Sequence, residues 1–249
     1  MAHDDDPAIS KGVKLLMDES GTAPALLRLE GVGHRYGDRE VLRGVSLHLD
    51  PSECVALVGH NGCGKSTLLR LAAGRESPTD GEVLFDSCPL NEDDPATRAR
   101  VSSVLDPAAY YPDLTVREHL LFVALAHGLG AEADEAVDRA LADHHLSDHG
   151  TALPESLSSG QSQLLLLASA FMRPHELLLL DEPEQRLDSR ARSELSDRLV
   201  SHKEQGAAVL MATHNMQLAS RVADRVVVLE SGVPVDAAAH GWAEADSAH

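Results

Sequence analysis

Hydrophobic and polar residues are spaced differently along the chain, and each spacing predicts a kind of element. From Leu26 to Leu49 they alternate around the turn signal Tyr36-Gly37-Asp38, which predicts β-strands. Short apolar runs predict further strands at 54–58, 82–85, 101–105, 177–180, 207–213 and 225–229. Apolar density predicts helices at 67–73, 133–146, 161–172, 188–202 and 216–223, and one more after a capping box at 115–118. Strands that alternate with helices after residue 54 favour an α/β fold with a mainly parallel sheet.

The two ends of the chain lack these patterns. Residues 1–23 are mostly polar and residues 236–249 are rich in Ala, His and Asp, so both are expected to be tails that flank a domain at 24–235. No segment reaches the roughly 20 apolar residues of a membrane helix. The first six residues are acidic where a signal peptide is basic, and we expect a cytoplasmic chain.

Charge and cysteine content exclude some classes of function. The formal net charge of −19 over 249 residues argues against nucleic acid as a partner, because phosphate contacts need a basic face. The three cysteines form no paired framework and have no metal-ligand spacing, which favours reduced thiols. A chain of this length is ample for a buried core.

A glycine-rich segment between the strand at 54–58 and the helix at 67–73 carries the strongest chemical signal. It reads G-x-x-x-x-G-K-S, as Gly59-His60-Asn61-Gly62-Cys63-Gly64-Lys65-Ser66, and Thr67 follows it. Strand, glycine loop and helix together turn backbone N–H groups and a helix N-terminus toward one anion. Lys65 can reach the outer phosphates and the Ser66 hydroxyl can bind magnesium. The segment predicts a site for a nucleoside triphosphate.

Two acidic residues follow the apolar run at 177–180. A carboxylate at the carboxyl end of a buried strand lies at the ligand crevice of an α/β sheet. Asp181 is therefore a candidate ligand of Mg²⁺, and Glu182 a candidate base for a water that attacks the γ-phosphate. The plainer alternative is a pair of acids that cap a helix.

With Leu157-Ser158-Ser159-Gly160-Gln161 upstream of these acids, the chain resembles the nucleotide-binding subunits of ABC (ATP-binding cassette) transporters over residues 26–235. Their signature sequence is L-S-G-G-Q, before an apolar helix. The resemblance implies a P-loop NTPase fold with an antiparallel β subdomain and a helical subdomain at about 107–160. It also implies that two cassettes pair head to tail and hold ATP between one P-loop and the other signature.

Several single positions gain a role from this resemblance. Tyr36 matches the aromatic residue that stacks on adenine, and His214 matches the switch histidine that contacts the γ-phosphate. Asp188 matches the aspartate that communicates across the pair of cassettes. The resemblance thus implies catalysis by Lys65, Glu182 and His214 with ATP and Mg²⁺.

The chain also departs from the family pattern. Asp106 stands where a glutamine that contacts the metal is usual, and Ser159 replaces the first signature glycine. Gln185-Arg186 replaces a pair of small residues, and the usual basic residues after Gln161 are missing. These changes suggest slow turnover or pairing with a different cassette, with ordinary drift as the open alternative.

The resemblance implies an ATPase that drives a separate membrane permease and binds to it at the inner face of the membrane. The short helical insert favours an exporter. A soluble or regulatory ABC ATPase with weak hydrolysis, acting on a macromolecular assembly, is the alternative. His145 and His149 have the spacing of a two-histidine metal site, but no third ligand lies nearby, which favours a solvated helix end.

Overall fold

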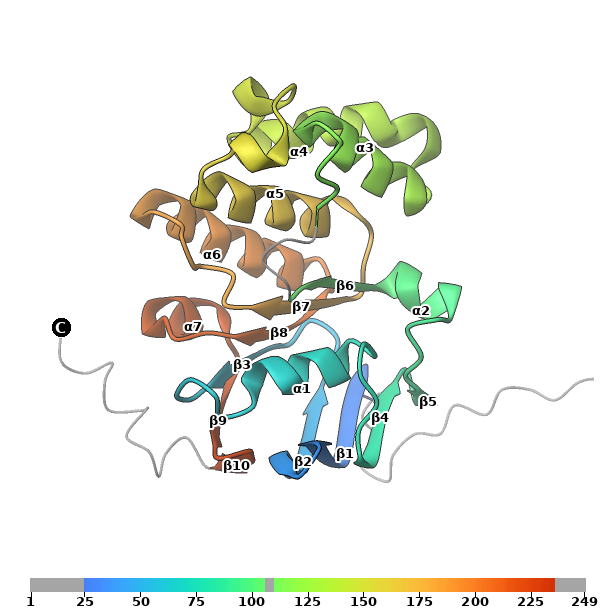
Figure 1. Cartoon of the computed structure of the whole chain (residues 1–249), viewed down its shortest axis with the longest axis vertical. Coiled ribbons are helices and arrows are strands. Elements are labelled where there is room, and N and C mark those ends of the chain that lie inside the picture. The colour runs from blue at the N-terminus through green and yellow to red at the C-terminus, as the bar shows by residue number, and fades with distance from the viewer. Residues whose placement is uncertain (1–24, 106–109, 236–249) are drawn as a thin grey trace, which may run out of the picture.

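Two β-sheets with helix α1 between them form the lower part of the protein in Figure 1. The computed structural model describes residues 25–105 and 110–235. The larger sheet has the order β10-β9-β3-β8-β7-β6 and is parallel except for β10. Its strands are β3 (Cys54–Val58), β6 (Val101–Val104), β7 (Leu177–Asp181), β8 (Ala208–Ala212), β9 (Arg225–Glu230) and β10 (Val233–Val235).

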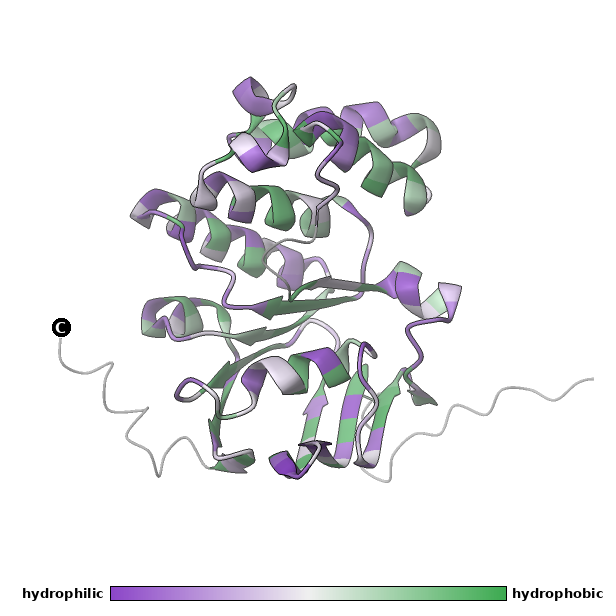
Figure 2. Cartoon of the chain, in the orientation of Figure 1, coloured by the Kyte–Doolittle hydropathy of each residue, from purple (hydrophilic) through white to green (hydrophobic). Residues whose placement is uncertain are grey.

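Both faces of this sheet are covered, as in other parallel sheets, because the helices that connect parallel strands lie on its faces. Along β7, Leu177 and Leu179 pack into the core on the side of α1, whereas Leu178 and Leu180 pack into the core on the opposite side. Figure 2 shows the resulting continuous hydrophobic colour along these strands. The run of four leucines is therefore a strand buried on both faces.

The smaller sheet is antiparallel and has the order β2-β1-β4-β5. Its strands are β1 (Leu27–Tyr36), β2 (Arg39–Leu49), β4 (Asp80–Phe85) and β5 (Cys88–Pro89). Helix α1 (Lys65–Ala72) buries its leucines between the two sheets. It ends because Gly74 adopts φ +73°, which lets the N–H of Arg75 reach the carbonyl of Arg70 at 3.0 Å.

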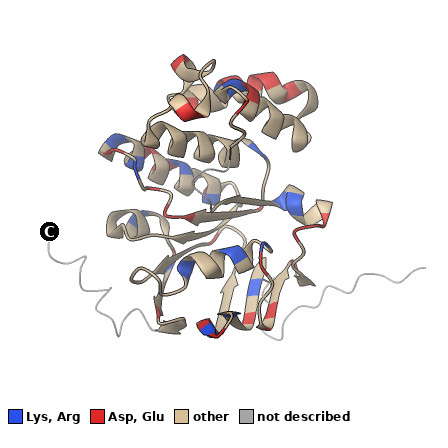
Figure 3. Ribbon diagram, viewed as in Figure 1, with Lys and Arg blue, Asp and Glu red and all other residues tan. Residues whose placement is uncertain are grey.

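Helices α5 (Ser159–Met172), α6 (Ser189–Glu204) and α7 (Met216–Val222) cover the opposite face of the larger sheet. Helices α3 (Val116–Ala126) and α4 (Ala133–Asp143) pack on α5 and form a third apolar cluster with it. Acidic residues gather on α4 and on the turn before it in Figure 3. The short α2 (Pro95–Arg100) precedes β6, and single 3₁₀ turns lie at Gly130–Glu132, Ser147–His149 and Pro154–Ser156.

The predicted fold class is confirmed: a mainly parallel sheet, an antiparallel sheet and a helical part are all present. The capping box is also found, with Thr115 and Glu118 each accepting a bond from the other's backbone. The second predicted helix ends three residues early, at Asp143, because His145 turns to φ +55°. The short strand β10 was not predicted. Within the described residues no helix is long and apolar enough to cross a membrane.

Candidate functional site

The three central strands of the larger sheet bring the predicted site residues to one edge. Strands β3, β8 and β7 are neighbours and run in parallel, so their carboxyl ends lie side by side. The glycine-rich segment follows β3, and His214 lies just beyond β8. Asp181 is the last residue of β7, and Glu182 follows it. Residues that are far apart in the sequence therefore meet where an α/β sheet binds its ligand.

The glycine-rich segment wraps tightly around the end of Lys65. The Lys65 ammonium donates hydrogen bonds to the carbonyls of Gly59 at 2.8 Å and His60 at 3.2 Å, and lies 4.0 Å from the sulfur of Cys63. Gly59 has φ +146°, and a Cβ there would come within 2.3 Å of the carbonyl oxygen of Leu229. A side chain at this position would push the loop away from β9. The loop holds the lysine at the N-terminus of α1.

A cavity of about 420 Å³, here called the P-loop pocket, opens beside this loop. The loop and helix α1 form one side of it, and strands β1 and β2 form the other. It is lined by Tyr36, Arg39, Val41, Asn61, Gly62, Gly64, Lys65, Ser66, Thr67 and Glu182. The pocket thus joins most of the predicted phosphate-binding residues to the predicted adenine-binding tyrosine.

Tyr36 is held at the rim of the P-loop pocket by its hydroxyl group. The hydroxyl donates to a carboxylate oxygen of Glu76 at 2.5 Å and accepts from the guanidinium of Arg70 at 3.3 Å. The ring of His34 meets the Tyr36 ring edge-on, at 4.7 Å between centroids. With 45% of the residue exposed, one ring face is free to stack on a flat ligand.

Ser66 lines the P-loop pocket, and Asp181 lies near it at the end of β7. The Ser66 hydroxyl is a hydrogen-bond donor that favours the charged form of the Asp181 carboxyl group. Burial raises the pKa of this carboxyl group above its ordinary value, and the Glu182 carboxylate raises it further, whereas the Ser66 bond opposes the rise. A hydroxyl and a carboxylate oxygen placed together are suitable ligands for Mg²⁺.

Glu182 and His214 form a contact between two neighbouring strand ends. An oxygen of Glu182 lies 2.9 Å from Nε2 of His214, and the two side chains are 20% and 42% exposed. Glu182 adopts φ +47°, which costs about 1 kcal/mol for a residue with a Cβ. The bond from its N–H to the carbonyl of Ala212, at 2.9 Å, maintains this conformation. The side chain is thereby directed toward His214.

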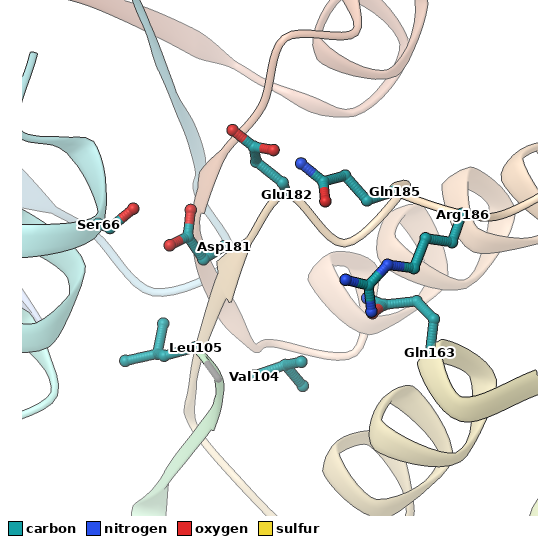
Figure 4. Close-up of a pocket in the computed structure, with 8 residues that line it drawn as sticks. All are labelled: Ser66, Val104, Leu105, Gln163, Asp181, Glu182, Gln185 and Arg186. Carbon is teal, nitrogen blue, oxygen red and sulfur yellow. The ribbon is translucent and has the colours of Figure 1, made fainter. Parts of the chain in front are cut away.

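A second cavity of about 240 Å³, here called the acid pocket, lies next to the P-loop pocket and shares Ser66 and Glu182 with it (Figure 4). The other residues of its lining come from β6, β7, α5 and the loop after β7. They are Val104, Leu105, Gln163, Asp181, Gln185 and Arg186. Two carboxylates and one guanidinium therefore face a single small space.

A buried hydrogen-bond network behind the Glu182–His214 pair was not predicted. The hydroxyl of Thr213 donates to an oxygen of Glu184 and accepts from the N–H of Asn215 at 2.9 Å. Thr213 is fully buried and Glu184 is 9% exposed. The network holds the loop that carries His214 against the loop that follows Glu182. The sequence carried a signal for this network, because Glu182 and Glu184 flank Pro183 directly after a buried strand.

The signature segment lies apart from the P-loop pocket and is not part of its lining. Ser158 caps α5: its hydroxyl accepts from the N–H of Gln161 at 3.3 Å, and the Gln161 side chain accepts from the N–H of Ser158 at 2.9 Å. Ser159 is the exposed first residue of the helix, without a positive φ. The close approach is at Gly160, where a Cβ would lie 2.8 Å from the carbonyl oxygen of Arg186.

Asp188 caps α6 with an oxygen that accepts from the N–H of Ala191 at 2.8 Å. Asp106 lies outside the described residues. His145 and His149 do not face a common point: His145 contacts Glu194 at 2.7 Å and His149 contacts Gln161 at 2.8 Å. Among the residues that the structure describes, no cluster of three His, Cys, Asp or Glu side chains could hold a metal ion.

Comparison with known proteins identifies the family. The family model described as "ABC transporter" matches residues 42–185. The aliphatic sulfonates import ATP-binding protein SsuB 2 of Xanthomonas axonopodis pv. citri (strain 306) is 41% identical over 83% of this chain and 68% of its own length. The spermidine/putrescine import ATP-binding protein PotA of Pseudomonas aeruginosa (strain UCBPP-PA14) is 35% identical over 84% of this chain and 58% of its own.

Among solved structures, the cassette MJ0796 in a dimeric post-hydrolysis state with ADP and phosphate matches with a TM-score of 0.78. It is 26% identical and the match covers 84% of this chain and 97% of that one. Both sequence relatives are named as import proteins, so the expectation of an exporter is not supported. The family model, the relatives and the fold agree: the chain belongs to the ABC transporter family, as an ATP-binding subunit of the ABC ATPase class.

Proposed function

We propose that this chain is the ATPase subunit of an import-type ABC transporter, which hydrolyses MgATP to drive a separate membrane permease. The contact of 2.9 Å between Glu182 and His214, at the edge shared by the two pockets, is the observation that carries the catalytic part. Glu182 accepts a proton from the attacking water. His214 orients that carboxylate through this contact. Neither residue could play this part if its strand ended elsewhere in the sheet.

Ser66 and Asp181 are the residues that hold Mg²⁺. Both line the acid pocket, and the buried carboxylate whose pKa is raised gains most from a neighbouring cation. Bound Mg²⁺ would neutralise negative charge on the β- and γ-phosphates. Lys65 exchanges its bonds to the carbonyls of Gly59 and His60 for phosphate oxygens, so its ammonium stays hydrogen-bonded in both states.

The signature segment serves a second cassette rather than this chain's own ATP. Ser158 caps a helix of 14 residues, and the free N–H groups at that helix end favour an anion. Ser158 to Gln161 are absent from the lining of the P-loop pocket on the same chain. A head-to-tail pair places each signature over the partner's triphosphate, with Asp188 near the contact. ATP then holds two copies, or this chain and a different cassette, together.

Three exposed apolar residues on the helical part, Tyr111, Phe122 and Leu125, provide the surface for the permease. The rings of Tyr111 and Phe122 meet edge-on at 4.8 Å between centroids, and each of the three residues is about half exposed. An exposed apolar patch of this kind indicates a surface that contacts another protein. We assign a cytoplasmic helix of the permease as its occupant, which places the chain at the inner face of the membrane. The import direction rests on the names of the relatives.

The catalytic assignment is tested by the rate of ATP hydrolysis in the presence and absence of Mg²⁺. Glu182→Gln, which keeps the size of the side chain, is expected to lose at least about a hundredfold in kcat. The matched control is Glu155→Gln, an exposed residue in the turn before the signature. An unchanged rate in Glu182→Gln, or equal losses in both variants, would remove Glu182 from the mechanism.

The transport assignment is tested in cells that produce the chain and its permease. Import predicts that Glu182→Gln abolishes ATP-dependent uptake of the transported solute, with aliphatic sulfonates and spermidine as the first solutes to assay. Phe122→Asp is expected to release the chain from membranes while it keeps its MgATP affinity. Continued membrane association of Phe122→Asp would contradict the docking surface, and efflux in place of uptake would contradict the direction.

A further inference from the structure

One cationic side chain of the acid pocket has no partner. Within the described part of the chain, the Arg186 guanidinium makes no hydrogen bond and no ion pair. Figure 4 shows the side chain extending from its loop into the pocket that it shares with Gln163, Asp181 and Glu182. A guanidinium presents up to five N–H donors in a fixed plane, and this geometry suits phosphate oxygens. Arg186 is exposed, so its guanidinium is open to solvent and available to an anion that enters the acid pocket.

The backbone conformation of Arg186 determines the direction in which its side chain leaves the loop. Arg186 adopts φ +64°, an unfavourable conformation for a residue with a Cβ. Its carbonyl oxygen lies so close to Gly160 that a Cβ there would come within 2.8 Å of it. The turn is closed by the bonds from Gln185 N–H to Glu182 O at 3.0 Å and from Leu187 N–H to Glu184 O at 3.3 Å. The loop thus holds Arg186 in a strained conformation whose side chain lines the acid pocket.

The two nearby carboxylates already have other partners. The Ser66 hydroxyl favours the charged form of Asp181, and Glu182 contacts His214 at 2.9 Å. Neither acid is therefore fully available to pair with Arg186. The acid pocket joins the P-loop pocket through Ser66 and Glu182. In a P-loop the serine hydroxyl binds the Mg²⁺ that contacts the β- and γ-phosphates, so the acid pocket, which Ser66 lines, borders the γ-phosphate end of a bound triphosphate.

We propose that Arg186 contacts the γ-phosphate of ATP bound to the P-loop of its own chain, and thereby makes this chain selective for the triphosphate over the diphosphate. This inference rests on the proposed function of the site and adds a residue to it. ADP ends before the acid pocket and gains nothing from Arg186. Hydrolysis therefore removes the contact, and the released phosphate leaves beside a guanidinium.

The test is calorimetric titration of purified protein with MgADP and with the Mg²⁺ complex of the slowly hydrolysed analogue AMP-PNP, at concentrations where the chain is monomeric. Arg186→Gln, which keeps a long polar side chain, is expected to raise the Kd for AMP-PNP about tenfold. The Kd for ADP is expected to stay within about twofold. Arg186→Lys, which keeps the charge but not the fork, is expected to recover part of the affinity.

The matched control is Arg190→Gln, an exposed arginine in the first turn of α6 whose side chain pairs with Glu194 instead. Equal Kd changes for AMP-PNP and ADP, or no change for either, would overturn the proposal. It would also be overturned if Arg186→Gln weakened only ATP-dependent dimerisation, because Arg186 would then act across the pair. Binding by the wild type that is lost in Lys65→Ala establishes the P-loop site separately, so the two proposals fail in different ways.

Discussion

Replacing Thr213 by valine tests the buried network that links the two loops of the site. Valine has nearly the shape of threonine, so the packing of this fully buried position is kept and only the hydroxyl is lost. Within the described residues, that hydroxyl is the one donor to Glu184, whose other carboxylate oxygen is buried without a partner. The substitution therefore leaves a buried carboxylate without any hydrogen bond and removes the acceptor for the N–H of Asn215.

The size of the effect follows from these two losses. A buried group that loses its hydrogen bond costs about 1–3 kcal/mol, with charged groups at the upper end. Thr213→Val is therefore expected to lower the free energy of unfolding by about 3 kcal/mol. The double variant Thr213→Val with Glu184→Leu removes both polar partners and is expected to recover most of that loss. Because His214 lies between Thr213 and Asn215, kcat is expected to fall about tenfold in both variants.

Urea unfolding followed by circular dichroism measures the stability, and phosphate release measures the activity. Ser196→Ala is the matched control, since it removes a buried hydroxyl that donates to a helix carbonyl at 3.0 Å and has no carboxylate partner. A loss below about 0.5 kcal/mol in Thr213→Val would refute the reasoning. A double variant as unstable as Thr213→Val alone would also refute it. The lost free energy of unfolding would then not come from the Glu184 carboxylate that is left without a hydrogen bond.

Three further predictions concern other parts of the fold. Gly160→Ala places a Cβ 2.8 Å from the carbonyl of Arg186 and is expected to cost about 1–3 kcal/mol in thermal unfolding, whereas Gly150→Ala, with no atom nearer than 3.7 Å, changes little. Burial lowers the pKa of His144 from 6.5 to about 4, so its contribution to stability is present above pH 6.5 and lost toward pH 4. About 2 kcal/mol is gone at pH 5, and urea unfolding of His144→Gln is expected to depend less steeply on pH. Tyr36→Ala is expected to weaken ATP binding about fivefold in calorimetry, while Tyr36→Phe, which keeps the ring, is not.

The parts of the site that are contiguous in sequence could be predicted from it. The P-loop is one segment between a strand and a helix, so its shape follows from local glycine and helix rules. Asp181 and His214 could be placed with it because parallel strands end at a common edge. The predicted roles of these residues in binding and catalysis stay predictions until the variants are measured.

Other features depend on contacts that no local pattern encodes. The bond from Thr213 to Glu184 joins residues 29 positions apart. The side-chain direction of Arg186, in the loop after β7, depends on its positive φ and on the close approach of Gly160 in α5. Ser159 illustrates the same limit: the sequence shows only that it replaces a signature glycine, whereas the structure places it on an exposed surface and places the close approach at Gly160.

The central claim is that ATP joins two cassettes, and the size of Glu182→Gln in solution tests it most directly. This variant is expected to bind ATP without hydrolysing it, so light scattering with MgATP is expected to show conversion of monomer to dimer. The double variant that also carries Lys65→Ala is expected to stay monomeric, since Lys65 lies within the P-loop and is the residue proposed to bind the phosphates. A Glu182→Gln protein that binds MgATP and remains monomeric would contradict pairing of this chain with itself.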